Sequence, residues 1–294
     1  MKNIIVTGAN GMVGRHMMAL LKDQETPAIG FTRQDWDLSK WKSIAELDNL
    51  FGDVQAVFHF GAHLPRSSID HDNQQTQLIF DTNIRSCLNI SEWAILRDVP
   101  VVFLSGAVVY ENPNGLRISE DAPKVINGFG GFYGYSKLMA ERIINHFVAD
   151  GLQSIILRPT SIYGYGLSHK KIVQKYIDTA LSGEMIHVSE PENRINLIHA
   201  YDVAFAALSA YQNKAWGVFN ISAERNCSIV EIAETAVLIA RSGSFDVDED
   251  KSKISSNFTR FDLDSGLAVN SFGFQSKVTL EYGMLLVKEG GMML

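Results

Sequence analysis

The stretch "TGANGMVG", residues 7–14, decides the fold. Gly8, Gly11 and Gly14 directly follow the apolar run "NIIVT" at 3–7 and open a helical stretch. In this order of strand, turn and helix, glycines allow a tight turn and let a pyrophosphate approach backbone N–H groups at a helix N-terminus. The alternative is a turn that serves helix packing only. The pattern predicts a dinucleotide-binding turn whose contacts come from Gly8, Asn10, Gly11, Met12, Val13 and Gly14.

Short β-rich runs alternate with segments of helical length along the first 160 residues. The runs lie at 3–7, 27–32, 54–60, 99–105 and 153–159, and helical patterns lie at 12–23, 76–97 and 133–150. Strands that are apolar throughout are typical of parallel sheets buried on both faces, and regular alternation with helices indicates βαβ units. We therefore expect an α/β protein with a Rossmann-type, doubly wound parallel sheet.

After Pro159 the rhythm becomes irregular. Helical patterns at 170–183, 201–212 and 228–241 are mixed with short strand-like runs at 186–189, 195–199 and 217–221. We expect residues 1–165 to form a dinucleotide-binding domain to which 194–222 return. Residues 166–193 and 223–294 would then form a smaller substrate-binding region.

Composition excludes several classes of protein. The longest apolar run, at 100–110, is far shorter than the roughly 20 residues of a membrane-spanning helix. The net charge is −7 and the chain has no block of basic residues. It therefore lacks the basic surface typical of nucleic-acid-binding proteins and the polybasic patch that binds anionic membranes. The N-terminal "MKNIIVTGANG" has no signal-peptide pattern, so we expect a cytoplasmic protein with a small-molecule partner.

Cysteines and histidines give no sign of a metal site. Cys87 and Cys227 are too few and too far apart for a disulfide framework or a thiolate site. His59 and His63 lie four residues apart on an expected strand end, without a carboxylate between them or a third ligand. We expect no metal.

The end of the second strand bears on the choice of dinucleotide. In "FTRQDWDLS", at 31–39, Thr32 and Arg33 occupy the place where an acidic side chain would bind both ribose hydroxyls of NAD. A guanidinium suits a 2′-phosphate, and the missing carboxylate removes repulsion against it. NADP is favoured. NAD stays open, because an error of two or three residues in the strand boundary would bring Asp35 into reach.

The stretch "FYGYSK", at 132–137, places Tyr133 four residues before Lys137. Residues at this interval share a helix face in any helix, so the spacing alone favours ordinary packing. A neighbouring ammonium and an oxidised nicotinamide would, however, lower the pKa of the phenol and suit it to acid–base catalysis.

With these motifs the chain resembles the extended short-chain dehydrogenase/reductase family, the NAD(P)-dependent nucleotide-sugar epimerases, dehydratases and 4-ketoreductases. The resemblance runs over nearly the whole length. It includes "FHFGAH" 58–63, "DTNIRSCLNISEWA" 81–94, "LRPTSIYGYG" 157–166, "RINLIHAYDVA" 194–204, "VFNISAE" 218–224 and "LAVNSFGF" 267–274.

The resemblance implies that Tyr133 is the catalytic acid/base and that Lys137 is its partner and a ligand of the nicotinamide ribose. A catalytic Ser or Thr should end the preceding strand, four residues before a tyrosine. Counting back four residues from Tyr110 reaches Gly106, which has no hydroxyl. Ser105 matches the catalytic position only if the alignment with the family is shifted by one residue. We expect Ser105 to supply the hydroxyl; otherwise the site works with Tyr133 alone or is degraded.

Further positions follow from the resemblance. Arg194 matches the place where the family binds the sugar nucleotide's diphosphate, for which a guanidinium is a natural bidentate partner. Ser161 stands where the family often has Asn, which puts one substrate contact in doubt. The other expected contacts are Asp37, Leu38, Phe60, Gly61, Ala62, Asn83 and Pro159 with the cofactor and His63 with the substrate.

Three functions remain open. The first is an NADP-dependent 4-ketoreductase of a nucleoside-diphosphate 4-keto-6-deoxyhexose, and the second is a 4-epimerase that uses tightly held NAD. A 4,6-dehydratase is disfavoured because Ala107 and Val108 replace the family's Asp-Glu pair. The third, suggested by Gly106, is a non-catalytic dinucleotide-binding sensor. By analogy with the family, helices at 76–97 and 133–150 would form a homodimer.

Overall fold

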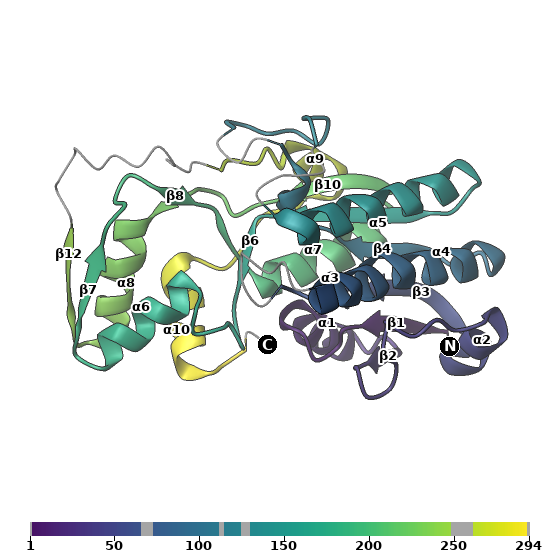
Figure 1. The fold of residues 1–294 in the computed structure, drawn as a ribbon, viewed down its shortest axis with the longest axis horizontal. Helices are drawn as coiled ribbons and strands as arrows, with labels where there is room; N and C mark the ends of the chain where they lie inside the picture. The colour runs from purple at the N-terminus through teal and green to yellow at the C-terminus, as the bar shows by residue number, and fades with distance from the viewer. Residues whose placement is uncertain (1, 66–72, 112–114, 125–129, 248–260, 293–294) are drawn as a thin grey trace.

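The computed structural model describes residues 2–65, 73–111, 115–124, 130–247 and 261–292. Within these ranges six parallel strands form one sheet in the order β10-β5-β4-β3-β1-β2 (Figure 1). The predicted α/β fold with a Rossmann-type sheet is confirmed. The strands are β1 (Asn3–Thr7), β2 (Ala28–Phe31), β3 (Val54–His59), β4 (Val101–Leu104), β5 (Ser154–Pro159) and β10 (Gly217–Ile221).

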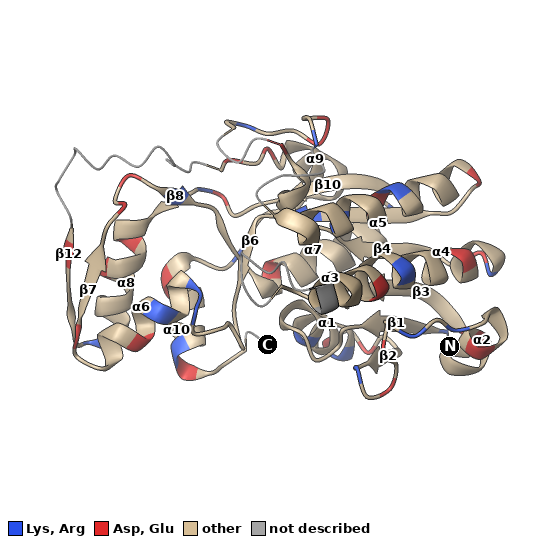
Figure 2. Cartoon of the chain, in the orientation of Figure 1, with Lys and Arg blue, Asp and Glu red and all other residues tan. Residues whose placement is uncertain are grey.

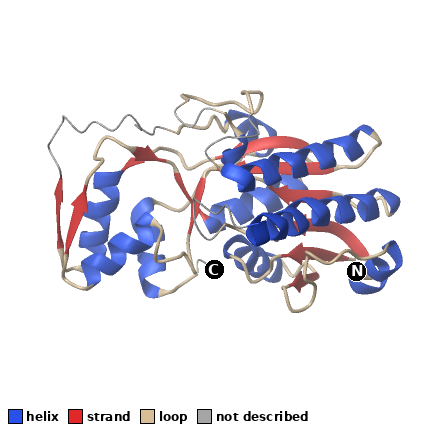
Figure 3. Ribbon diagram, viewed as in Figure 1, coloured by secondary structure: helices blue, strands red, loops and turns tan. Residues whose placement is uncertain are grey.

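Both faces of the sheet are apolar, and helices cover them (Figure 3). Along β1, Ile4 and Val6 pack into one core while Ile5 packs into another, because successive strand side chains point to opposite faces. The first face is covered by α1 (Met12–Asp23), α7 (Ala200–Gln212) and α9 (Gly266–Phe272). The second is covered by α2 (Ile44–Phe51), α4 (Ser86–Leu96) and α5 (Gly131–Ala149).

The helix predicted at 76–97 is composite. It consists of α3 (Asn73–Ile79), the π-helical η1 (Phe80–Arg85) and α4. A π-helical segment often marks a functional site. Here it places Asn83 beside the loop that follows β3.

A second core lies in the smaller region, on the left of Figure 1. It is built from α6 (Ile172–Leu181), α8 (Ile229–Ala240), α10 (Leu280–Glu289) and the parallel pair β7 (Met185–Val188) and β12 (Ser244–Val247). An antiparallel pair, β8 (Arg194–Ile195) and β11 (Cys227–Ser228), lies beside them. The parallel pair β6 (Ser161–Tyr163) and β9 (Leu197–His199) joins the two regions.

Helix α9 lies in the larger region, although its residues fall within the range 223–294 expected for the smaller one. Ala268 and Phe272, four residues apart on one helix face, are buried against the same core as α1 and α7. Phe274 follows them into that core. The stretch 248–260 of the expected smaller region lies outside the described residues.

Charged residues of both signs are interspersed over the described part of both regions (Figure 2). None of the helices that the structure describes is long and apolar enough to cross a bilayer.

Candidate active site

One cavity of about 980 Å³ lies where the sheet order reverses, between β1 and β3. Loops at the carboxyl ends of β1, β2, β3, β4 and β5 line one side, and Gly166–Ser168, Lys171 and Arg194–Asn196 line the other. In open α/β sheets this reversal point is the usual ligand site. All the site residues predicted from the sequence line this cavity except Asn83.

The glycine-rich turn is shaped by very close backbone approaches. A Cβ on Gly14 would lie 2.1 Å from the Gly8 carbonyl oxygen, and a Cβ on Gly8 would lie 2.7 Å from the Gly61 nitrogen. Gly8 also has a φ of +69°, in the left-handed region. Gly11 caps α1 without a side-chain hydrogen bond, so the cap residue itself leaves the first N–H groups of the helix uncovered. This cradle fits a dinucleotide pyrophosphate.

Asn83 does not line the cavity, but it anchors the loop that follows β3 by hydrogen bonds. Its Oδ1 accepts the His63 N–H at 2.7 Å, and its Nδ2 donates to the His63 carbonyl at 3.1 Å and to Ser136 Oγ at 3.0 Å. The amide therefore ties the cavity-lining residues Phe60–His63 to α5. Its contacts run to the protein chain, so Asn83 supports the cavity wall rather than forming part of it.

His59 has a structural place beneath the same loop. Its Nδ1 lies 2.7 Å from Thr7 Oγ1 and its Nε2 lies 3.2 Å from Ser86 Oγ, while Thr7 Oγ1 accepts the Gly61 N–H. Burial lowers the pKa of His59 to about 3, so the ring is neutral. Among the described residues, no group of three or more His, Cys, Asp and Glu side chains has a metal-binding arrangement.

At the end of β2 the cavity is lined by Thr32 and Arg33 and not by Asp35. Asp35 Oδ2 accepts the Thr32 hydroxyl at 2.7 Å and the Thr32 N–H at 2.8 Å. These hydrogen bonds lower the pKa of Asp35 and turn its carboxylate back onto its own turn. Trp36, which the sequence interpretation missed, is buried and also lines this end.

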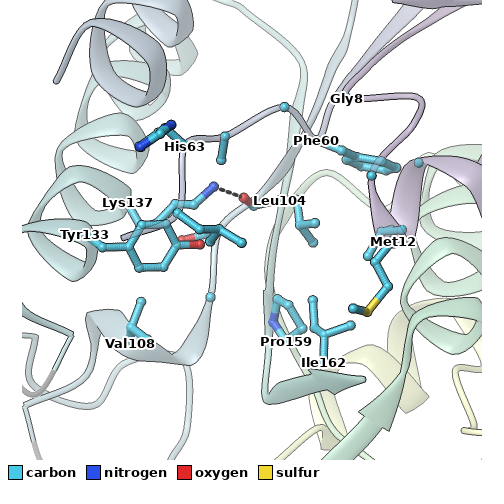
Figure 4. A pocket seen from close by; sticks show the side chains of 18 of the residues that line it. Gly8, Met12, Phe60, His63, Leu104, Val108, Tyr133, Lys137, Pro159 and Ile162 are labelled. Atoms are coloured by element: carbon cyan, nitrogen blue, oxygen red, sulfur yellow. Dashed lines mark hydrogen bonds between the residues drawn. The ribbon is translucent and has the colours of Figure 1, made fainter. Parts of the chain in front are cut away.

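Tyr133 and Lys137 project from one face of α5 into the cavity (Figure 4). Lys137 Nζ donates to the Leu104 carbonyl at 2.7 Å and lies 5.8 Å from the centre of the Tyr133 ring. Burial lowers the pKa of Lys137 to about 8 and raises the pKa of Tyr133 well above its usual value. In this arrangement burial outweighs any acidification of the phenol by Lys137, whose ammonium donates to the Leu104 carbonyl. The acidification expected from Lys137 together with an oxidised nicotinamide stays a prediction.

Ser105 lines the cavity, but its hydroxyl is directed into the protein. Oγ donates to Glu141 Oε1 at 2.5 Å, and Glu141 forms a buried ion pair with Arg158. The proton of Ser105 is thus directed to Glu141 in this arrangement, and the expected hydrogen bond of Ser105 to the substrate stays a prediction. Gly106 has an extended backbone, and a Cβ there would make only an ordinary 3.6 Å contact with Val108.

The far end of the cavity carries the residues predicted to bind substrate. Ser161 and Arg194 are exposed and line it together with Asn196, whose Oδ1 accepts the Thr160 hydroxyl at 2.8 Å. Lys171 and Phe261 also line this end of the cavity, and they were not predicted from the sequence as site residues. Neither lies in a recognisable motif, and only the fold brings them to the cavity.

Comparisons with known proteins agree on the fold. The model of the NAD dependent epimerase/dehydratase family matches residues 4–222. The structure is similar to MoeE5 in complex with UDP-glucose and NAD, with 22% identity over 98% of both chains and a TM-score of 0.80. It is also similar to UDP-N-acetylglucosamine 4-epimerase from Bacillus cereus (21% identity, 98% and 96% of the chains, TM-score 0.82). UDP-glucose 4-epimerase from Thermus thermophilus with NAD gives 19% identity over 98% of both chains and a TM-score of 0.80.

Proposed function

Since the chain belongs to the NAD dependent epimerase/dehydratase family, we propose that this enzyme transfers hydride between a nicotinamide dinucleotide and C4 of a nucleoside-diphosphate sugar. The observation that carries the proposal is the meeting of two motifs in one cavity. Tyr133 and Lys137, one helical turn apart on α5, share it with the glycine-rich turn. The first motif suits proton transfer and the second suits dinucleotide binding.

The residues present fit the dinucleotide. Gly8, Gly11 and Gly14 leave the backbone accessible to a pyrophosphate, and Lys137 would hold the nicotinamide ribose. The bound nicotinamide supplies the acceptor and donor of hydride. The cofactor contacts expected from the sequence, except Asn83, are available at the cavity wall, while Asn83 acts through the His63 loop.

Tyr133 would move the proton on the C4 oxygen of the sugar. When C4 is oxidised, the Tyr133 oxygen takes the hydroxyl proton as hydride leaves C4, and when C4 is reduced, the phenol returns it. Burial alone raises the pKa of Tyr133, so the phenol keeps its proton. A positive charge beside the phenol favours its ionised form, and Lys137 on the same helix face supplies that charge. Ser105 has no direct part in this step.

We propose 4-epimerisation as the reaction. In a 4-epimerase, oxidation and reduction occur on the same sugar, and hydride returns to its opposite face. Solved structures named as UDP-N-acetylglucosamine and UDP-glucose 4-epimerases, one of them with NAD, support this choice. Arg194, Ser161 and His63 would contact the substrate, with the Arg194 guanidinium on its diphosphate.

Reduction of a 4-keto sugar by NADPH is the second candidate, and the end of β2 favours it. Thr32 and Arg33 line the cavity while the Asp35 carboxylate is bound within its own turn. That arrangement offers the Arg33 guanidinium to a 2′-phosphate and keeps the Asp35 carboxylate away from a ribose diol.

One experiment separates the two reactions. Purified protein is incubated with UDP-glucose or UDP-N-acetylglucosamine and NAD, and in parallel with an NDP-4-keto-6-deoxyhexose and NADPH. Epimerisation interconverts the C4 epimers, as followed by chromatography, without net change in absorbance at 340 nm. Reduction consumes NADPH in proportion to product. Intact dinucleotide binding with no turnover in either assay would contradict the proposal and favour a sensor.

A further inference from the structure

A buried polar network lies directly behind the catalytic wall of the cavity. Glu141, Arg158 and Ser105 are 1%, 4% and 4% exposed. Arg158 Nε and Nη2 donate to the two Glu141 oxygens at 2.9 and 2.7 Å, and Ser105 Oγ donates to the first of these at 2.5 Å. Burying such a pair is costly in desolvation, and the bidentate geometry offsets part of that cost. The network joins the ends of β4 and β5 to α5.

The network continues the line of side chains that begins at Tyr133. Tyr133, Lys137 and Glu141 follow at intervals of four residues on α5, so they share one face of the helix and descend from the cavity into the core. Lys137 Nζ donates to the carbonyl of Leu104, and Glu141 accepts from Ser105, the next residue. The end of β4 is therefore fastened to α5 at two adjacent points, one cationic and one anionic.

Glu141 is the charged neighbour of Lys137. The other titratable side chains acting on this ammonium or feeling its charge are His59 on β3 and Cys87 on α4. Burial lowers the pKa of His59 to about 3 and raises the pKa of Cys87 to about 12, so both are neutral at neutral pH. Tyr133 is neutral for the same reason. The negative charge that faces Lys137 thus comes from Glu141, while Arg158 faces Glu141 from β5.

We propose that Glu141 is a positioning residue of this site: clamped by Arg158, its carboxylate fixes the Ser105 end of β4 and places a negative charge one helical turn below the Lys137 ammonium. The inference rests on the proposed function, in which Lys137 acts as a cation beside Tyr133. It gives the ion pair a role in turnover in addition to its role in packing.

The sign of the effect follows from the charges. Burial lowers the pKa of Lys137 to about 8, and Cys87 and then Glu141 oppose that fall. Of these two groups Glu141 carries the negative charge, because burial raises the pKa of Cys87 to about 12. In Glu141→Gln the ammonium should lose its proton at lower pH. We expect the alkaline limb of the pH profile of kcat to move to lower pH by about one unit or more. The KM for the nucleotide sugar should stay within about twofold, because the substitution acts on Lys137 and not on the residues proposed to bind the diphosphate.

Companion variants separate positioning from folding. Glu141→Gln leaves the Arg158 charge unpaired in the core, which can prevent folding. The double variant E141Q/R158Q removes both charges of the pair, so it should displace the limb in the same direction but by less than Glu141→Gln. Glu141→Asp retains the charge and should restore the parent limb. Asp48→Asn is the matched control, because it removes a carboxylate that binds Arg97 at 2.8 and 2.6 Å but is exposed and outside the cavity.

A second measurement reads Lys137 directly. The side-chain ¹⁵N resonance of Lys137 in lysine-labelled protein, titrated with pH, reports its pKa whether or not turnover occurs. We expect a lower pKa in folded Glu141→Gln than in the parent and in Asp48→Asn, and a smaller shift in the same direction in E141Q/R158Q. An unchanged Lys137 titration in a folded variant, or an unchanged alkaline limb, would overturn the inference. Absence of turnover in the parent would instead count against the proposed function alone.

Discussion

The two ends of the cavity are shaped by different parts of the chain. At the glycine-rich end the backbone itself forms the wall, with Gly8, Gly14 and Gly61 so close that an added Cβ has no room. At the Tyr133 end the wall is set by side chains, and the buried Glu141–Arg158 pair holds them from behind. Close backbone packing tolerates no added atom, whereas the side-chain wall leaves room beside Gly106. The difference predicts that a side chain added in the glycine-rich turn weakens dinucleotide binding, whereas Gly106 at the Tyr133 end accepts one.

The largest effect should come from Tyr133→Phe, which tests whether the side-chain end performs the chemistry. Removing the hydroxyl removes the proton donor and acceptor, so kcat should fall by roughly 10²–10⁴-fold. Dinucleotide affinity, measured by fluorescence titration, should stay within about twofold because the glycine-rich end is untouched. Tyr135→Phe is the control, since Tyr135 packs on Phe132. A Tyr133→Phe enzyme with parental kcat would refute the proton route.

Gly14→Ala tests the backbone end. The added Cβ would meet the Gly8 carbonyl oxygen at 2.1 Å, so the turn must shift. Overpacking of this kind costs about 1–3 kcal/mol, and since the shifted turn is the surface that receives the pyrophosphate, we expect roughly fivefold to 150-fold weaker dinucleotide binding. Gly106→Ala, whose Cβ makes an ordinary contact at 3.6 Å, should bind like the parent. Equal dinucleotide affinities in Gly14→Ala and Gly106→Ala would contradict the expected difference between the two ends of the cavity.

Arg33→Ala tests the cofactor preference at the end of β2. Losing the guanidinium should weaken NADP binding by about tenfold and leave NAD binding nearly unchanged, since only NADP carries the 2′-phosphate. Dissociation constants for both dinucleotides, measured by calorimetry, check this. Arg117→Ala, which changes an arginine side chain that is 81% exposed, serves as the control. A parallel loss for both dinucleotides would show that Arg33 does not select between them.

The smallest effects concern the hydroxyl beside Tyr133. Ser105→Ala removes a donor that is committed to Glu141, so kcat should fall only about threefold to tenfold, the cost of one hydrogen bond. Gly106→Ser places a hydroxyl where the extended backbone and free space accept it, and kcat should rise by a similar factor. Steady-state kinetics on both variants decide the matter. A hundredfold loss in Ser105→Ala would restore Ser105 as a direct substrate donor.

The sequence was informative wherever the deciding contacts are local. The glycine-rich turn and the apolar strands occupy consecutive residues, and the structure places the predicted strands in one sheet. Tyr133 and Lys137 were found because a helical turn fixes their separation. Most predicted site residues meet in the cavity because parallel strands bring their carboxyl ends to one edge.

Contacts between distant segments could not be derived in this way. Ser105 is fixed by Glu141 and Arg158, which belong to two other elements. The fall of the Tyr133 pKa expected from the Lys137 ammonium and an oxidised nicotinamide left out burial, which acts in the opposite direction. The expected boundary at 223 also failed to show that α9 returns to the larger core, because Ala268 and Phe272 form too short an apolar pattern to indicate a destination.

The place of the last two helices has a consequence for synthesis of the chain. Ala268, Phe272 and Phe274 complete the core around the sheet, and Met284 and Val287 of α10 complete the smaller core. A nascent chain that has reached residue 265 therefore still lacks a wall of each core and exposes apolar surface from both. We expect truncation before α9 to yield an aggregation-prone fragment instead of a folded half, because each core would be left open on one side.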